Sequence, residues 1–417
     1  STSPFPRPPS CALAPSPPST WLTLSPYDPI DAAARSCYNR AVKMLIGIDA
    51  SRATNARRTG TENYSLHLIR ELLALGGGHR FRLYFNQAPP PGLFLGDAES
   101  RVMPSPRLWT HLRLSWEMRS RPPDLLFVPS HVLPLVHPQR SVVTIHDLGY
   151  HYYPQAHTLS QNLYLRWSTR YNARAATAIL ADSEATRADL VHYYRIPESK
   201  IVVVYPGRDE TLVPVVDPEA LAAVRSHYGL TGPYFLYVGT LHPRKNLVRL
   251  VQAFAALMQS GSETLPSDLQ LVLAGQKGWL YEEIFAQVRK LGLTGRVVLT
   301  GYVPDADLAA LLSGALAFVF PSLYEGFGFP VLEAMACGTP VVCSGVSSLP
   351  EVAGDAALLV DPLDVDALAE ALGRIVTDSD LRRSLVDRGF HQIQRFTWRR
   401  CARETLQVLE GAGRGLD

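Results

Sequence analysis

The chain has 417 residues, too many for one ordinary hydrophobic core, so we expect two domains. Its 40 basic side chains stand against 38 acidic ones, which excludes the strongly basic balance of a general nucleic-acid binder. No apolar run reaches the roughly 18 residues of a membrane-spanning helix. The five cysteines are odd in number and lack metal-ligand spacing, and this cysteine usage favours a reducing cytoplasm over a disulfide framework.

The first 43 residues differ in composition from the rest. They are rich in proline and serine and show no apolar period, so they cannot bury enough surface to offset the entropy of ordering them. We therefore predict a disordered leader over residues 1–43. Because a strand-like run follows Met44 at once, we interpret Met44 as the natural start and the leader as foreign to the protein. A processed pro-segment is the alternative.

From Met44 onward, short β-rich runs alternate with amphipathic stretches of about 10 to 18 residues, which is typical of parallel strands joined by crossover helices. In the first half of the chain, the runs predicted as strands are residues 45–50, 124–128, 141–145 and 177–181. One helix is predicted over residues 62–75. Another is predicted after Ser183, a residue type that favours the N-cap position.

A second series of the same kind begins after residue 209. The runs predicted as strands are residues 234–239, 269–275, 296–301, 315–320 and 339–345. The predicted helices are residues 246–258, two patterns within 364–393, and a last one near 398–410. This indicates an α/β protein with two doubly wound parallel-sheet domains. A ligand of such a pair binds at the carboxyl ends of the strands, in the cleft between the domains.

The stretch TLHPRKN follows directly on the predicted strand that ends at Gly239. It carries Arg244 and Lys245 beside a helix start. A helix N-terminus supplies unpaired N–H groups, and the two cations add charge-assisted hydrogen bonds, so the loop is a candidate anion site. A solvated basic loop is the alternative, and these residues alone do not decide between the two.

The stretch YEGFGFPVLEAMACGTPVV places two carboxylates, Glu325 and Glu333, in an apolar segment where acidic side chains need partners. Gly326 and Gly328 let the backbone approach a ligand closely, and Pro330 suits the first turn of a helix. With Glu333 on that first turn, the segment could bind a sugar, a diphosphate and a ribose diol in a row. The alternative is that both glutamates cap the helix.

These stretches resemble the retaining glycosyltransferases of family 4, which have the GT-B fold. EGFGFPVLEAMACGTPVV is similar to the family's E-x7-E motif, and VGTLHPRKNL to its phosphate-binding segment. VVTIHDL resembles the histidine loop of the N-terminal domain, and SEATRADLVHYYRIPESKIVVVYPGRD the crossing between the domains. GYVPDADLAALLSGALAFVFPSLYEGFG resembles the segment that leads into the glutamates. The resemblance covers residues 44–412.

The resemblance implies two Rossmann-like domains that face a central cleft. Residues 44–212 would be the N-terminal acceptor domain and residues 213–395 the C-terminal nucleotide-sugar-binding domain. Residues 396–417 would form a helix that crosses back to the N-terminal domain. The implied partners are a nucleotide-diphosphate sugar and a glycan or lipid-linked acceptor, with no cofactor and no metal. We interpret the aspartates at 364–366 and 378–380 as helix caps rather than metal ligands.

Carried over residue by residue, the resemblance implies that Glu325 contacts hydroxyls of the donor sugar and Glu333 the ribose diol. Arg244 and Lys245 would hold the diphosphate, and His146 would lie over the donor sugar. The other residues implied at the donor are Gly326, Phe327, Gly328 and Phe329 through their backbone, together with Thr240, Gly60 and Asp147.

Two positions depart from the family pattern, and this weakens the assignment of residues to the diphosphate contact. The first glycine-rich loop reads ARRTGTENY, so Gly60 lacks its usual paired glycine. Thr240 stands where other members have an arginine, which leaves Arg244 to supply that phosphate contact. For Asp147, orienting the imidazole of His146 and lining the acceptor side both remain open.

The implied reaction breaks the bond between a sugar and a nucleoside diphosphate, on which two negative charges develop. Arg244, Lys245 and the helix N-terminus would stabilise them. No carboxylate is singled out for double displacement, so the resemblance favours front-face substitution with retention, in which the leaving phosphate oxygen helps to deprotonate the acceptor. The RKN form resembles bacterial mannosyltransferases of cell-surface polysaccharides, so GDP-mannose is the expected donor.

Other functions stay open at this point. A UDP-sugar-dependent transferase and a nucleotide-sugar epimerase of similar architecture fit the same motifs. A nicotinamide oxidoreductase is disfavoured because the loop after the first strand lacks GxGxxG. A catalytically inactive partner subunit is disfavoured because both glutamates and the Arg-Lys pair are intact.

The stretch RLWTHLRLSWEMRSR, residues 107–121, mixes two tryptophans with arginines. A basic amphipathic patch of this kind can rest on an anionic membrane surface, which would place the protein at the inner face of the membrane. The favoured alternative is a helix that packs Leu108, Leu112 and Trp116 into the N-terminal domain.

Overall fold

The computed structural model describes residues 43–55, 60–105, 108–130, 132–261 and 264–414. The predictions of a disordered leader and of a start at Met44 concern a segment that, apart from Lys43, lies outside the described residues.

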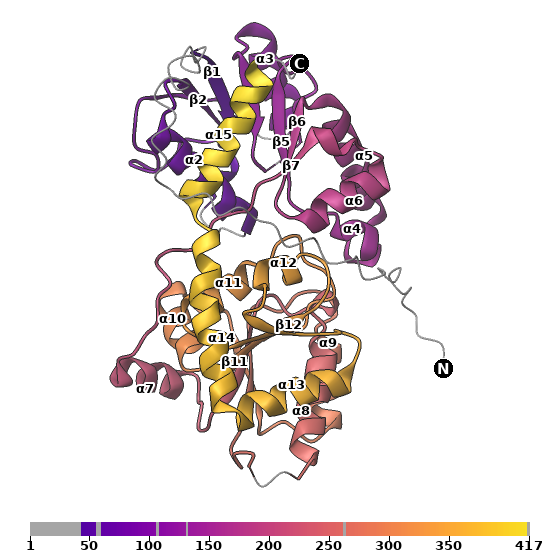
Figure 1. Ribbon diagram of the computed structural model, residues 1–417. Coiled ribbons are helices and arrows are strands. Elements are labelled where there is room, and N and C mark those ends of the chain that lie inside the picture. The colour runs from indigo at the N-terminus through magenta and orange to yellow at the C-terminus, as the bar shows by residue number, and fades with distance from the viewer. Residues whose placement is uncertain (1–42, 56–59, 106–107, 131, 262–263, 415–417) are drawn as a thin grey trace, which may run out of the picture. The chain divides into compact units, whose positions relative to one another are not determined.

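The N-terminal half forms a seven-stranded sheet in the order β3-β2-β1-β4-β5-β6-β7, and all neighbouring strands are parallel (Figure 1). Most side chains of the central strands are buried, as expected for a sheet covered on both faces. The strands are β1 (Leu45–Asp49), β2 (Arg80–Phe85), β3 (Ala98–Val102), β4 (Leu125–Val128), β5 (Ser141–Ile145), β6 (Ala178–Ala181) and β7 (Ile201–Val203).

Helices connect these strands. The prediction of an N-cap at Ser183 is confirmed, because its hydroxyl accepts a hydrogen bond from the backbone N–H of Thr186 at 3.1 Å. The helices are α2 (Gly60–Leu75), the π-helix η2 (Trp109–Leu114), α3 (Ser115–Ser120), α4 (Gly149–Tyr152), α5 (Leu159–Ala175) and α6 (Glu184–Tyr194).

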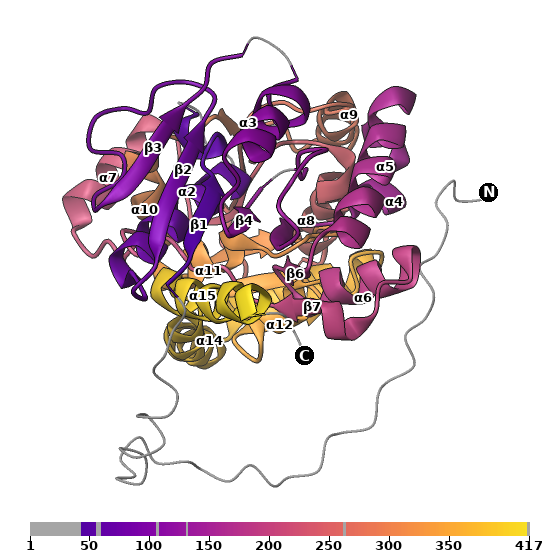
Figure 2. The same ribbon diagram turned by 90° about the horizontal axis from the view of Figure 1, so that it is seen from above.

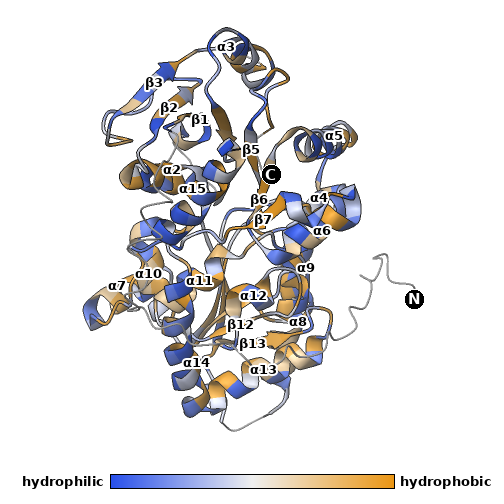
Figure 3. Ribbon diagram, turned by 45° about the horizontal axis from the view of Figure 1, so that its top comes forward, coloured by the Kyte–Doolittle hydropathy of each residue, from blue (hydrophilic) through white to orange (hydrophobic). Residues whose placement is uncertain are grey.

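The C-terminal half forms a second parallel sheet, of six strands in the order β10-β9-β8-β11-β12-β13. In both sheets the strand order reverses beside the first strand, which makes both doubly wound and confirms the predicted α/β class. Figure 3 shows hydrophobic colour on inner strands of both sheets, whereas the edge strand β3 is hydrophilic. These strands are β8 (Tyr234–Val238), β9 (Gln270–Ala274), β10 (Val297–Gly301), β11 (Ala317–Phe320), β12 (Val341–Ser344) and β13 (Ala357–Val360).

The helices of the second half include the two that were predicted to begin at aspartate caps. Asp364 accepts from the backbone N–H of Ala367 at 2.9 Å and Asp378 from that of Leu381 at 2.8 Å, so both caps are confirmed. The helices are α7 (Pro218–His227), α8 (Leu247–Gln259), α9 (Glu282–Lys290), α10 (Asp305–Ser313), α11 (Phe329–Ala336), α12 (Leu349–Ala353), α13 (Val365–Thr377) and α14 (Ser379–Gln392).

The last helix, α15 (Trp398–Arg414), lies against α2 in the N-terminal half (Figure 1). Its buried residues Trp398, Cys401 and Leu409 share a hydrophobic core with β1, β2 and β4. The chain leaves the N-terminal half near Gly207 and returns to it at Trp398. A Cβ on Gly207 would lie 2.3 Å from the backbone N of Trp398, so glycine is required for these two segments to lie so close.

Candidate active site

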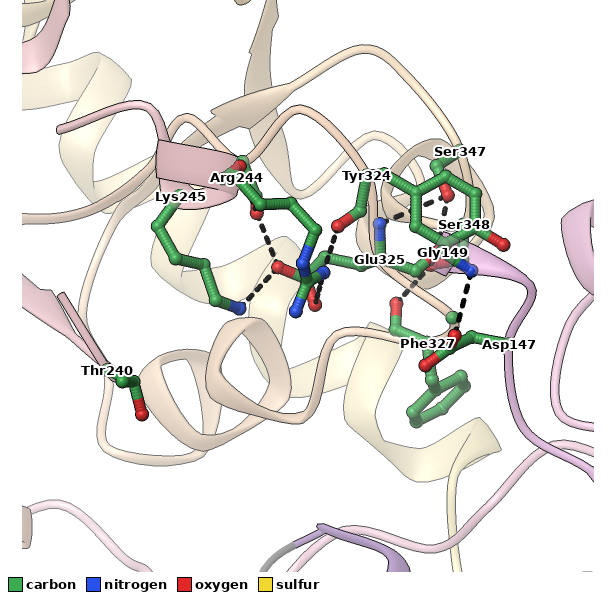
Figure 4. Close-up of polar contacts among 12 residues, drawn as sticks. Asp147, Gly149, Thr240, Arg244, Lys245, Tyr324, Glu325, Phe327, Ser347 and Ser348 are labelled. Carbon is green, nitrogen blue, oxygen red and sulfur yellow. Dashed lines mark hydrogen bonds and ion pairs between the residues drawn. The ribbon is translucent and has the colours of Figure 1, made fainter. Parts of the chain in front are cut away.

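Loops at the carboxyl ends of β8 and β11 meet at the carboxylate of Glu325 (Figure 4). Its Oε1 lies 2.5 Å from Nζ of Lys245, and its Oε2 lies 3.1 Å from Nη1 of Arg244. The hydroxyl of Ser322 also donates to Oε1. The structure thus brings together three residues predicted for the site, and it pairs Glu325 with both cations.

Burial and charge act against each other in this cluster. Lys245 and Glu325 are each only 9% exposed. Burial tends to raise the pKa of Glu325, but the charges of Lys245 and Arg244 outweigh it and lower that pKa to about 2. Burial also lowers the pKa of Lys245. Glu325 is therefore ionised at any physiological pH.

The glycine loop after Glu325 leads into α11. Gly328 has φ +123°, a conformation that favours glycine, and precedes the helix as its N-cap residue. No side chain caps α11, and its first turn holds no acidic residue. The alternative that the two glutamates cap this helix is therefore wrong. Since no side chain satisfies the first N–H groups of α11, they are suited to an anion.

Glu333 was predicted on the first turn of this helix, and that placement is wrong. Because α11 begins at Phe329, Glu333 lies on its second turn. Its partly buried carboxylate forms no hydrogen bond or ion pair with any other described residue. Burial, with the nearby negative charges of Asp209 and Asp305, raises the pKa of Glu333 to about 7. An acid without a protein partner in such a place is a candidate for binding a ligand.

His146 is held by both ring nitrogens within the N-terminal half. Nδ1 lies 2.6 Å from Oδ2 of Asp182, and Nε2 donates to the carbonyl oxygen of Pro129 at 2.9 Å. Burial alone would lower the pKa of His146, but the charge and hydrogen bond of Asp182 raise it. The open alternative in which Asp147 orients the imidazole is wrong, because Asp182 does so. Asp147 is exposed and accepts from the backbone N–H of Gly149 at 2.9 Å.

Tyr324, next to Glu325 in the chain, reaches into the N-terminal half. Its hydroxyl accepts from the backbone N–H of Leu148 at 3.1 Å and donates to Asp189 Oδ2 at 2.8 Å. Its ring stacks on that of Tyr152 with centroids 4.7 Å apart. The hydroxyl of Tyr152 in turn donates to the other oxygen of Asp189. The backbone that carries Glu325 is thereby tied to the N-terminal half.

Two further contacts hold the halves together. The hydroxyl of Ser183 donates to the carbonyl oxygen of Gly326 at 2.7 Å. The carboxylate of Glu351, on α12, accepts from the backbone N–H groups of Glu184 and Ala185 at the N-terminus of α6. Sequence reasoning missed Asp182, Asp189, Tyr324 and Glu351, and only Tyr324 carried a signal, its position beside Glu325.

The remaining predicted residues lie around this cluster. Thr240 is exposed and lies apart from the ion pairs in Figure 4. The side chain of Phe327 is buried in the C-terminal core, and its carbonyl oxygen accepts from the hydroxyl of Ser348 at 2.6 Å, which leaves its backbone N–H to face a ligand. A Cβ on Gly60 would lie 3.5 Å from the ring of Phe329, which places this glycine beside the start of α11. Residues 56–59 of that loop lie outside the described residues.

Known proteins are similar to this chain in sequence. Residues 226–392 match the family described as "Glycosyl transferases group 1", and residues 58–212 match "Glycosyltransferase Family 4". The O-antigen chain mannosyltransferase B of Escherichia coli is 35% identical over 304 residues, which are 73% of this chain and 78% of that protein. The chain belongs to glycosyltransferase family 4.

Solved structures agree with this family 4 assignment in fold. Sucrose-phosphate synthase from Thermosynechococcus elongatus has a TM-score of 0.67 at 24% identity, over 88% of this chain and 98% of its own. HepE from Anabaena, in complex with UDP-glucose, has a TM-score of 0.67 at 19% identity, over 88% of this chain and 100% of its own. This family 4 glycosyltransferase therefore has the predicted GT-B fold.

None of the helices formed by the described residues is long and apolar enough to cross a membrane. The same residues contain no group of three or more His, Cys, Asp or Glu side chains that could hold a metal ion. Independence of a metal stays a prediction.

We expect Tyr324→Phe to lower the stability of this glycosyltransferase by about 1 to 3 kcal/mol, because it leaves Asp189 and the Leu148 N–H short of a partner. Thermal unfolding measures the loss. Tyr302→Phe, at an exposed tyrosine, is the matched control and should melt like the wild type. Equal melting of all three proteins would mean that the hydroxyl of Tyr324 does not hold the two halves together.

Proposed function

We propose that this family 4 glycosyltransferase transfers a hexose, mannose from GDP-mannose, to a glycan or lipid-linked acceptor in the synthesis of a cell-surface polysaccharide. The observation that carries the proposal is the 35% identity to an O-antigen chain mannosyltransferase, over most of both chains. The cluster of Arg244, Lys245 and Glu325, with the unpartnered Glu333, supports it because these groups suit a charged nucleotide sugar.

In this proposal the diphosphate of the donor lies between the two cations and the N-terminus of α11. As the bond between the sugar and the phosphate oxygen breaks, negative charge grows on the leaving group. Arg244 and Lys245 stabilise that charge most in the transition state. Glu325 already pairs with both cations, so a bound diphosphate must share them with it. In the proposed complex, the Glu325 carboxylate also contacts hydroxyls of the transferred sugar.

We propose retention by front-face substitution. A double displacement needs a free carboxylate under the anomeric carbon. Glu325 is a poor candidate for it, since two cations bind its charge and hold its pKa at about 2. In the front-face step, the acceptor oxygen bonds to the anomeric carbon on the side from which the diphosphate leaves. The proton of the acceptor passes to the leaving phosphate oxygen.

We keep the interpretation that His146 lies over the donor sugar. Its ring nitrogens already bond Asp182 and Pro129, so it is proposed to act through its position and charge rather than as a proton donor.

A panel of GDP-, UDP- and ADP-sugars tests the donor. We expect GDP-mannose to give the largest rise in melting temperature and, with an acceptor present, stoichiometric release of GDP. Stabilisation and turnover with UDP-sugars alone would contradict the GDP-mannose proposal. Conversion of the donor into an epimeric sugar without an acceptor would favour the epimerase alternative.

We further predict full activity in excess chelator, because Arg244, Lys245 and a helix N-terminus supply the positive charge that a metal would otherwise bring. Turnover before and after chelator treatment is the measurement. Loss of activity that magnesium or manganese restores would overturn the metal-free mechanism.

A further inference from the structure

Three large apolar side chains of η2 and α3 point into solvent. Leu108, at the start of η2, is 62% exposed, Leu112 61% and Trp116 69%. The favoured sequence interpretation packed these residues into the N-terminal domain, and it is wrong. They follow one another at four-residue spacing, so they line one side of the helical segment, while Trp109 and Leu114 fill the core on another side.

A second apolar stripe lies on α5, where Leu159, Leu163 and Trp167 are exposed at the same spacing. The two helical segments adjoin, because Nε2 of His111 lies 3.0 Å from the hydroxyl of Tyr164. Figure 2 views α3 and α5 from above.

The loop after β4 links the two stripes. The hydroxyl of Tyr171, on α5, donates to the carbonyl oxygen of Pro134 at 2.9 Å, and the backbone N–H of Val136 donates to Ser115 at 3.2 Å. Two exposed residues of this loop extend the surface. We call the whole set the apolar face: Leu108, Leu112, Trp116, Leu135, Val136, Leu159, Leu163 and Trp167.

Arginines border this apolar face. Residues 108–121 hold three arginines and one acid, Glu117, whose carboxylate is already paired with Arg101 at 3.1 Å and Arg113 at 3.5 Å. Helix α5 holds three arginines and no acid. Five of these arginines are exposed and form no ion pair with other described residues: Arg119, Arg121, Arg166, Arg170 and Arg174.

The arginines and the apolar side chains lie next to each other on α5. Arg166 and Arg170 are each three residues beyond an apolar residue, Leu163 and Trp167, so the basic stripe runs beside the apolar one. Soluble monomers rarely expose so many large apolar side chains together. Leucine and tryptophan beside unpaired arginines are typical of surfaces that lie in the headgroup region of an anionic bilayer.

We propose that the apolar face docks this protein on the surface of an anionic lipid bilayer. Trp116, Trp167 and the leucines enter the headgroup region, and the bordering arginines contact lipid phosphates. The charge favours lipid over an apolar protein partner, because the five exposed arginines form no ion pair with other described residues. The inference does not depend on which sugar the enzyme transfers.

Flotation of the full chain with vesicles tests the proposal. We compare vesicles of phosphatidylcholine alone with vesicles that also contain phosphatidylglycerol. The protein should float with the anionic vesicles and mostly stay behind with the neutral ones, and added salt should weaken the binding.

Two double variants separate the apolar from the electrostatic contribution. Leu112→Ser with Trp116→Ser should weaken binding to anionic vesicles by about tenfold or more. Arg170→Glu with Arg174→Glu should weaken it by about fivefold for each charge removed. All four side chains are exposed, so melting temperatures should match the wild type.

Matched controls place equal changes elsewhere on the surface. Leu95→Ser with Val216→Ser removes two still more exposed apolar side chains, and Arg289→Glu with Lys290→Glu reverses two charges on α9. Both controls should bind vesicles like the wild type. Equal binding of all variants, or equal binding to neutral and anionic vesicles, would overturn the proposal. Absence of vesicle binding together with self-association that Leu112→Ser abolishes would show an interface between copies instead.

Discussion

Lys245→Ala is expected to lower kcat by about a hundredfold, which corresponds to roughly 3 kcal/mol of lost transition-state stabilisation. The ammonium group of Lys245 faces the proposed diphosphate, whose charge grows as the sugar leaves, so the loss falls more on kcat than on KM. Steady-state kinetics with a saturating acceptor measure it. Lys290→Ala, at an exposed lysine on α9, is the control and should keep wild-type rates.

Lys245 also neutralises Glu325, and a double variant separates the two roles. If Lys245 mattered only by pairing with Glu325, then adding Glu325→Gln to Lys245→Ala would restore both stability and GDP affinity. If it holds the diphosphate, the double variant regains stability but still binds GDP weakly. Recovery of the GDP affinity would contradict the proposed role of Lys245.

Glu333→Gln is expected to raise KM for the donor by about tenfold to a hundredfold, the effect of losing about 1.5 to 3 kcal/mol of hydrogen bonding to a charged group. The ribose does not react, so its contact is nearly the same in the ground and transition states, and kcat should change little. An unchanged KM would mean that Glu333 does not bind the nucleotide.

Glu333 also affects how the stability of the folded protein depends on pH, and here its replacement should be favourable. The pKa of Glu333 is raised to about 7 in the folded state, from about 4.5, so folding favours its protonated form. Its contribution to stability is fully present below pH 4.5 and is lost as the pH rises through about 7. At pH 8 the ionised side chain therefore costs up to about 3 kcal/mol.

Glu333→Gln should accordingly melt higher than the wild type at pH 8 and equally at pH 5. The donor affinity of the wild type should rise between pH 6 and pH 8 as the carboxylate forms, and that of the variant should not. A variant that melts lower than the wild type at pH 8 would show that Glu333 has a structural role.

Local patterns predicted much of the fold. The strands β1 and β5 were predicted from short β-rich runs, and the start of α6 from Ser183, because such signals depend only on neighbouring residues. The strand β3 was not predicted, and the helix α5 was expected only as a helix pattern without bounds after residues 141–145. The strand is mostly exposed and polar, and α5 carries arginines beside its apolar stripe, so neither shows a clean period.

Some residues of the site were likewise predicted from local patterns, and others were not. The loops with Arg244, Lys245 and Glu325 were predicted because each stands at a strand end within one half of the chain. The partners of Tyr324 and His146 were not, since Asp189 and Asp182 lie far away in sequence and no local pattern links them. The spacing of Leu108, Leu112 and Trp116 predicted an apolar side of a helix, but spacing cannot show whether that side faces the core or solvent.

Calorimetry with GDP tests the central claim most directly, because it measures the proposed donor site without the reaction. We expect GDP to bind the wild type, and Glu333→Gln and Lys245→Ala each to weaken binding by about tenfold or more. Glu325→Gln should not weaken it and should tighten it, since Arg244 and Lys245 would no longer be shared with a carboxylate. Equal GDP affinity in the wild type and all three variants would contradict this assignment of the donor site.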